Sequence, residues 1–191
     1  MTVFDFPYSC FPKELKNDIE VAIMAIPNKT VNNVFFVTKD ILREYELTSG
    51  IVLFPYRLYF IDVRDENIKS LTDKQKKILY SLYTRSNNGH LREKYINKLL
   101  HTELEEWCLP FIVGICDDYV VEILELIYST LSKRANDDIK EFCKHNKVFV
   151  RKSYSRMVSY WNAYYRYKDT YRKFSEYVGK KLFKECLGFD K

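Results

Sequence analysis

The chain has 191 residues, of which 47% are hydrophobic and 30% charged, and these proportions exclude a disordered or a fibrous protein. Only five glycines and five prolines occur, and this scarcity favours long helices over a many-turned β-sandwich. No apolar run is long enough to span a bilayer, and the first residues do not resemble a secretory leader. The five cysteines match neither a C-x-x-C motif nor a zinc site, so we expect reduced thiols in a cytoplasmic protein.

The net charge of +5 is unevenly distributed along the chain. Residues 140–191 hold 14 Lys and Arg against 5 Asp and Glu, whereas residues 99–132 hold seven acidic residues and no Lys or Arg. The two segments could pack against each other or form solvated faces. Alternatively, the basic segment could attract phosphate or an acidic partner.

The first elements along the chain are predicted from helix breakers and periodicity. A helix is expected over residues 13–26, because Pro12 precedes it and Pro27 ends it. A second helix is predicted over residues 30–47. The aromatic and β-branched segment at 51–63 contains a proline, and this composition favours an extended strand or a short hairpin.

The following elements are predicted to be helical. Thr72 and Gln75 form a capping box that opens a helix over residues 73–85. The sequence SNNG is typical of a tight turn, after which residues 90–100 are predicted to form another helix. A long apolar helix is expected over residues 111–131, after Pro110.

The last predicted helices lie in the basic part of the chain. Asn136 is expected to cap a helix that begins at the following aspartates. The segment 151–178 contains neither glycine nor proline, and its periodicity predicts an amphipathic helix over residues 151–182.

These elements predict a mainly α-helical protein with one compact domain over residues 1–191. We expect roughly six to eight helices, arranged in stacked antiparallel pairs, and one short extended segment or hairpin near residues 51–63. Residues 12–147 would form the core of the domain. Residues 148–187 would form a basic, tyrosine-rich and amphipathic C-terminal region.

The stretch SNNGHLREKYINKLL carries a resemblance to a known family. In HEAT-type helical repeats an acidic turn leads into a Val-Arg pair that opens the second helix. Leu91 and Arg92 stand in the place of that pair, while Asn87 and Asn88 stand where the family prefers Asp. Residues 71–131 therefore resemble a HEAT-type repeat, and the resemblance implies stacked antiparallel helices.

No recognisable catalytic motif occurs in the sequence. The G-x-S-x-G, G-x-G-x-x-G, P-loop and H-E-x-x-H patterns are all absent. Asp118, Glu122 and Glu125 fall on one polar helical stripe that most simply faces water. Alternatively, the carboxylates of this stripe could bind a hard cation, but no E-x-x-H pair accompanies them. We therefore predict a non-enzymatic protein without a metal or another cofactor. An enzyme of unfamiliar design, acting around Asp117, Arg92 and His90, is a further alternative.

Asp117 lies among apolar residues on the expected helix over residues 111–131. A buried carboxylate without a cationic partner is costly, so we expect a structural ion pair. The candidate partners are Arg92 and Arg85, which lie in the neighbouring predicted helices.

The segment 155–173 interleaves five tyrosines and one tryptophan with arginine and lysine. On a continuous helix, Trp161, Tyr164 and Phe174 would lie on the apolar face, which predicts that they belong to the core. The residues outside that face are the candidates for contact with a partner: Arg151, Lys152, Arg156, Tyr160, Tyr165 and Tyr167.

Tyrosine and arginine are favoured anchors of protein interfaces. The predicted function is therefore the binding of another macromolecule, with a protein as the first choice of partner. Nucleic-acid binding through the same basic, tyrosine-rich region is the alternative, because aromatic rings interleaved with cations also bind single strands. We expect no membrane association.

Overall fold

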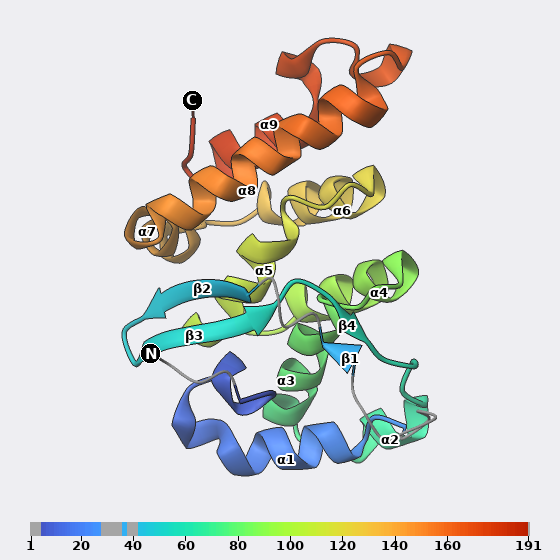
Figure 1. Cartoon of the computed structure of the whole chain (residues 1–191), viewed down its shortest axis with the longest axis vertical. Coiled ribbons are helices and arrows are strands. Elements are labelled where there is room, and N and C mark those ends of the chain that lie inside the picture. The colour runs from blue at the N-terminus through green and yellow to red at the C-terminus, as the bar shows by residue number, and fades with distance from the viewer. Residues whose placement is uncertain (1–4, 28–35, 38–41, 191) are drawn as a thin grey trace. The chain divides into compact units, whose positions relative to one another are not determined.

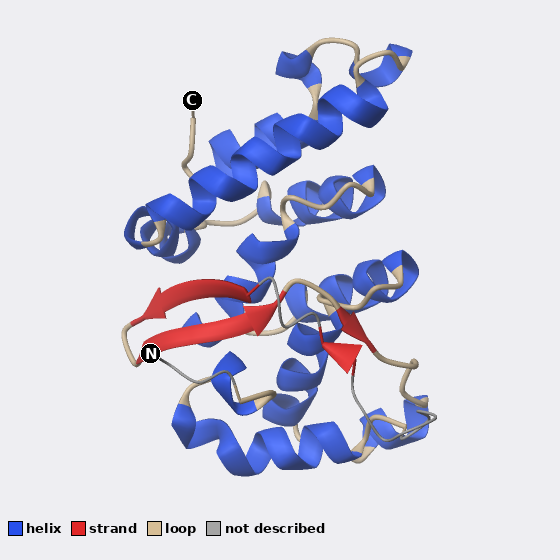
Figure 2. Ribbon diagram, viewed as in Figure 1, coloured by secondary structure: helices blue, strands red, loops and turns tan. Residues whose placement is uncertain are grey.

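The protein is mainly α-helical in a computed structural model that describes residues 5–27, 36–37 and 42–190 (Figure 2). This confirms the predicted fold class. The chain divides into two compact units, Met1–Cys108 and Leu109–Lys191. The boundary precedes the predicted start of the C-terminal region at residue 148, and a single domain over the whole chain stays a prediction.

In the residues that the structure describes, the first unit combines four α-helices with two small antiparallel sheets (Figure 1). Its helices are α1 (Lys16–Met24), α2 (Asp65–Lys69), α3 (Asp73–Tyr83) and α4 (Gly89–Leu100). Its strands are β1 (Phe36–Val37), β2 (Leu42–Leu47), β3 (Gly50–Pro55) and β4 (Leu58–Tyr59). β1 pairs with β4, and β2 pairs with β3. The predicted extended segment near 51–63 is thus confirmed as strands β3 and β4.

Two helices of the first unit, α1 and α4, pack against α3. Thr72 and Gln75 form the predicted capping box at its N-terminus, and the Gln75 side chain also donates to Asp18 on α1 at 2.9 Å. The buried side chains of α1 pack on α3, while α4 packs on it through stacked Tyr83 and Tyr95 rings with centroids 4.4 Å apart. Contacts between side chains, rather than helix propensity alone, therefore stabilise these helices and hold them together.

The prediction of a helix over residues 30–47 is wrong where the structure describes this segment. Residues 42–47 form β2, and every second side chain along it is buried, which is the period of a strand. The ring of Tyr45 stacks on Phe54 of β3 at 5.4 Å between centroids. Gly50 has a φ of 124° at the turn of the hairpin, a conformation that other residues rarely adopt. Residues 30–35 and 38–41 of the predicted helix lie outside the described residues.

The second unit contains five α-helices among its described residues (Figure 1). They are α5 (Leu109–Ile115), α6 (Val121–Leu131), α7 (Asp137–His145), α8 (Lys147–Tyr160) and α9 (Val178–Lys181). α9 packs against α6 and against the long helix α8. Its contact with α8 is close, because a Cβ atom on Gly179 would lie only 2.9 Å from Cγ of Met157.

The predicted single helix over residues 111–131 is wrong, since the chain leaves the helical path between α5 and α6. Asp117 and Asp118 lie in this break. The Asp118 carboxylate accepts a hydrogen bond of 3.1 Å from the backbone N–H of Val120. Such a local bond offers the backbone an alternative to helical hydrogen bonding and therefore favours the break.

The predicted continuous helix over residues 151–182 is also wrong. α8 ends in a π-helical turn over Trp161–Tyr165, and short 3-10 turns then lead the chain back to α9. The Trp161 indole N–H donates to the carbonyl oxygen of Tyr171 at 2.8 Å, and its ring packs on Phe174 at 4.9 Å between centroids. Contacts between the returning chain and α8 thus outweigh the local preference for helix.

Candidate functional site

The π-helical turn at the end of α8 determines which tyrosines of this segment reach the surface. A π turn contains one residue more than an α turn, and the Arg166 N–H correspondingly bonds to Trp161 O at 2.9 Å. The extra residue shifts the helical phase of everything that follows. As a result Tyr164 is 55% exposed, although its position on a regular helix predicted burial, and Tyr165 takes the buried position with 8% exposure. The prediction that Tyr164 belongs to the core is therefore wrong.

Tyr165 fixes the π turn to the loop between α5 and α6. Its hydroxyl donates to the carbonyl oxygen of Tyr119 at 2.6 Å and accepts from the N–H of Val121 at 3.2 Å. Its ring stacks on Tyr177, with centroids 5.6 Å apart and planes 26° apart. Burial raises the pKa of the Tyr165 hydroxyl, while the bond from Val121 acts in the opposite direction. The hydroxyl therefore keeps the proton that it donates.

Three rings gather on the outside of this junction, and we call Tyr119, Tyr160 and Tyr164 the tyrosine surface. The Tyr119 ring meets Tyr160 edge-on at 5.8 Å and Tyr164 at 6.4 Å, and Tyr160 stacks on Tyr164 at 6.1 Å. Tyr119 is 42% exposed and Tyr160 is half-buried, and the neighbouring Tyr167 is 86% exposed beside Arg166. The rings come from two separate segments, so the anchoring of Tyr165 holds them in one arrangement.

Charges of both signs surround the tyrosine surface. Arg156 on α8 donates from Nε to the buried Asp117 carboxylate at 2.9 Å. Glu122 and Glu125 lie on α6, close enough to Tyr165 to raise the pKa of its hydroxyl. Glu125 also accepts a hydrogen bond from Tyr171. Cations lie at the same end of α8, because Arg166 contacts the Tyr167 ring and Nζ of Lys168 lies 5.0 Å from the centre of the Tyr165 ring.

The six predicted partner-binding candidates occupy three different environments. Tyr160 belongs to the tyrosine surface and Tyr167 is exposed beside it, while Arg156 lies nearby in its ion pair with Asp117. Tyr165 is buried and holds the junction together. Arg151 and Lys152 are exposed on the first half of α8, away from the tyrosines.

Two residues of the tyrosine surface were not among these candidates. Tyr119 follows two aspartates, and Asx residues that bond to nearby backbone N–H groups are a recognised signal for a break in a helix. That signal could have placed Tyr119 in a loop. Tyr164 could not have been identified, because the π turn that exposes it has no comparable mark in the sequence.

The predicted ion pair of Asp117 is found with a partner that the sequence analysis did not consider. Asp117 is 2% exposed and pairs with Arg156 of its own unit. The predicted partners lie in the first unit, where Arg92 donates to Ser86 O at 3.0 Å and Arg85 donates to Tyr56 O at 3.0 Å. These bonds tie both arginines to backbone carbonyls. A pairing of Asp117 with Arg92 or Arg85 stays a prediction.

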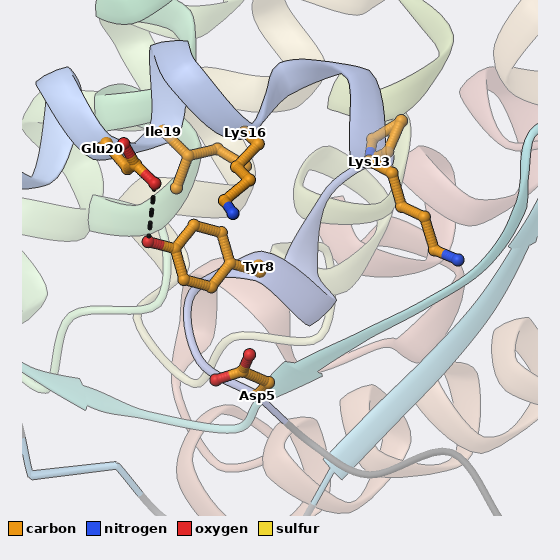
Figure 3. Close-up of a pocket in the computed structure, with 7 residues that line it drawn as sticks. Asp5, Tyr8, Lys13, Lys16, Ile19 and Glu20 are labelled. Atoms are coloured by element: carbon orange, nitrogen blue, oxygen red, sulfur yellow. Dashed lines mark hydrogen bonds between the residues drawn. The ribbon is translucent and has the colours of Figure 1, made fainter.

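A separate pocket of about 350 Å³ opens in the first unit beside α1 (Figure 3). The Tyr8 hydroxyl donates to Glu20 at 3.2 Å, and Nζ of Lys16 lies 5.8 Å from the centre of the Tyr8 ring. Asp5 and Lys13 also line it, so the charges of the pocket are balanced. This balance gives it no preference for an anionic or a cationic ligand, and the tyrosine surface is the stronger candidate site.

Two classes of site are not seen in the part of the chain that the structure describes. Its His, Cys, Asp and Glu side chains form no group of three that could hold a metal ion. No helix within the same residues is long and apolar enough to cross a membrane. The five cysteines are free thiols, and all of them are buried.

Comparisons with known proteins identify no relative of this chain. No protein-family model matches the sequence, no curated protein matches it, and no solved structure matches the fold. The resemblance of residues 71–131 to HEAT-type repeats gains no support from these comparisons. The function is therefore inferred from the geometry of the site.

Proposed function

We propose that this chain is a non-enzymatic, cytoplasmic protein that binds another protein through the tyrosine surface. The observation that carries the proposal is the group of three mutually contacting tyrosine rings at the surface, supported from below by the buried Tyr165. A tyrosine ring supplies a large contact area at a low cost in side-chain entropy. Because these rings already contact one another, little further ordering accompanies binding.

The charges around the rings favour a protein over a nucleic acid at this surface. A single-stranded nucleic acid needs cations that follow its phosphates on the same face as the stacking rings. Arg156 is instead paired with Asp117, and Glu122 and Glu125 lie on the adjacent helix. Mixed charge of this kind is typical of the polar rim of a protein interface. Nucleic-acid binding through the basic C-terminal region is the alternative and would use other residues, including Arg151 and Lys152.

The proposal is tested by quantitative affinity capture from the native cell, with nuclease-treated and untreated lysates compared. The variant is Tyr164→Ala, and the matched control is Tyr59→Ala, which removes a ring that is 45% exposed in the first unit. We expect a specific protein to be captured by the wild type and by the control, with or without nuclease, but not by Tyr164→Ala.

Two results would contradict the proposal. The first is a set of captured proteins that is the same for the wild type and for Tyr164→Ala. The second is a captured set that disappears after nuclease treatment or falls steeply with added salt, as contacts to a phosphate backbone do. Thermal melting of both variants provides the control for folding, because neither exposed ring should contribute much to stability.

A further inference from the structure

A second, smaller pocket lies on the second unit, at the opposite end of α8 from the tyrosine surface. Its volume is about 130 Å³, and its walls come from α7, the first half of α8 and the turn at Leu187–Phe189. Gly188 has a φ of 67° in this turn, and the Phe189 N–H bonds to Phe183 O at 2.8 Å. The ring of Phe189 packs on Tyr154 of α8 at 5.3 Å. The wall that the C-terminal turn contributes is therefore held by backbone and ring contacts.

The charged side chains that line this pocket are all cationic. Lys144 comes from α7, and Lys147 and Arg151 come from α8, where all three are exposed. Lys144 pairs with Glu141 at 2.9 Å, whereas Lys147 and Arg151 form no ion pair within the described part of the chain. Asp190, the nearest acid along the chain, is engaged by Lys180 and Lys184. Among the residues that the structure describes, no acidic side chain thus pairs with Lys147 or Arg151, and most of the positive charge of the pocket is uncompensated by them.

The remaining walls of the pocket are uncharged. Leu187 and Phe189 are apolar, and burial raises the pKa of the Cys143 thiol to about 12, so this thiol stays protonated and neutral. A thiol held in this form is not a nucleophile. The pocket therefore combines cationic donors with a neutral wall, which is suitable for binding an anion and not for covalent chemistry.

We propose that this pocket binds a dianionic phosphate group that is carried on a ligand as a monoester. The volume is well below the roughly 300–1,000 Å³ of pockets that enclose a drug-sized molecule, so one small group enters and the rest of the ligand stays outside. Arginine and lysine together supply forked and point-like donors to phosphate oxygens. A nucleic-acid backbone carries singly charged phosphates in a row and needs an extended groove, whereas this site is short.

The test is a titration of the whole chain with three probes at about 0.15 M salt, where the Debye length is only about 8 Å, followed by calorimetry or by NMR shifts of α7 and α8. The probes are O-phosphoserine as a dianionic monoester, dimethyl phosphate as a singly charged diester, and an oligothymidylate without terminal phosphates. We expect saturable binding of O-phosphoserine, at least about fivefold tighter than dimethyl phosphate, because a second charge adds to each charge-assisted hydrogen bond.

Variants distinguish the pocket from general electrostatic attraction. Arg151→Gln should weaken O-phosphoserine binding by about tenfold, the effect of losing one charge-assisted hydrogen bond. The matched control is Lys152→Gln, because Lys152 is the next residue along the exposed face of α8 and does not line the pocket. It should change binding by less than about twofold, since exposed charges outside a contact are screened. If Arg151→Gln folds poorly, Lys147→Gln tests the role of the pocket in O-phosphoserine binding independently.

Three results would overturn the proposal. The binding of O-phosphoserine could fail to saturate, or Lys152→Gln could weaken this binding as much as Arg151→Gln does. The oligothymidylate could bind more tightly than O-phosphoserine with a steep dependence on salt, which would assign the basic face to nucleic acid instead.

Discussion

The Tyr165 hydroxyl donates a hydrogen bond of 2.6 Å to the carbonyl oxygen of Tyr119, and this bond joins the π turn of α8 to the loop between α5 and α6. The same hydroxyl accepts from Val121, so one side chain serves two backbone groups of the loop. Both tyrosine-bearing segments of the surface are thereby held together. The arrangement of the exposed rings depends on a buried ring.

The first prediction concerns this bond. Tyr165→Phe leaves the Tyr119 carbonyl and the Val121 N–H without the hydroxyl, and we expect a loss of about 1–3 kcal/mol in the free energy of unfolding. The measurement is urea denaturation. Tyr164→Phe is the control and should lie within about 0.5 kcal/mol of the wild type, because its hydroxyl is at an exposed position. Equal stability of the two variants would show that the junction does not depend on Tyr165.

The second prediction concerns the approach of α9 to α8. A Cβ atom on Gly179 would lie 2.6 Å from Cε1 of Tyr177 and 2.9 Å from Cγ of Met157. Although alanine favours a helix more than glycine does, Gly179→Ala should destabilise the protein by about 1–3 kcal/mol because of overpacking.

A double-mutant cycle checks the cause of that loss. In a Met157→Ala background the added methyl group meets less resistance, so the penalty of Gly179→Ala should shrink without vanishing. A stabilising effect of Gly179→Ala in the wild-type background would mean that the two helices do not approach as closely as described.

The third prediction concerns Asp117 and its partner Arg156. Because Asp117 is buried and ion-paired, Asp117→Ala should lower the free energy of unfolding by about 3–5 kcal/mol, as the breaking of a buried pair does. Combining it with Arg156→Ala isolates the pairwise contribution, which should exceed about 0.5 kcal/mol. If the losses in the free energy of unfolding from the two single substitutions are strictly additive, the contribution of Asp117 to stability comes from contacts other than its pair with Arg156.

The fourth prediction is a loss of stability at alkaline pH that originates in Tyr177, which is buried, and in Tyr171, which is half-buried. Burial raises the pKa of Tyr177, and burial together with the hydrogen bond to Glu125 raises the pKa of Tyr171. Tyrosines in the unfolded chain ionise near about pH 10, so their contribution is complete below that value and is lost as the pH rises further. The melting temperature should therefore fall steeply above about pH 10.

Tyr177→Phe provides the matched comparison. The Tyr177 hydroxyl is buried and has no hydrogen-bond partner among the described residues. Its removal should leave stability at neutral pH unchanged or slightly higher, and should reduce the alkaline loss. A steeper alkaline loss in Tyr177→Phe than in the wild type would contradict this account.

Local signals in the sequence were sufficient to predict the helices whose boundaries are marked by capping or turn residues beside them in the chain. The capping box at Thr72 and the turn before α4 were predicted because the residues that end and begin these helices are adjacent in the chain. β2 was missed because its alternation includes a buried arginine at position 43, which resembles a surface residue of a helix. Its strand conformation depends on pairing with β3.

The candidate site was predicted only in part, because it depends on tertiary contacts. Tyr160 and Tyr167 were identified from their position on a regular helix. The π turn then exchanged the expected environments of Tyr164 and Tyr165, and no residue type in WNAYY signals such a turn. The cause is the burial of Tyr165 against Tyr177, a partner that lies after the chain has folded back.

The most direct test of the central claim is site-specific photocrosslinking from the tyrosine surface in the native cell. A photoreactive phenylalanine analogue is introduced in place of Tyr164 and, as the control, in place of Tyr59. We expect a discrete adduct from position 164 that protease digests and nuclease leaves intact, with no such adduct from position 59. An adduct from position 164 that nuclease removes, or the same adducts from both positions, would contradict the claim that this surface binds a protein.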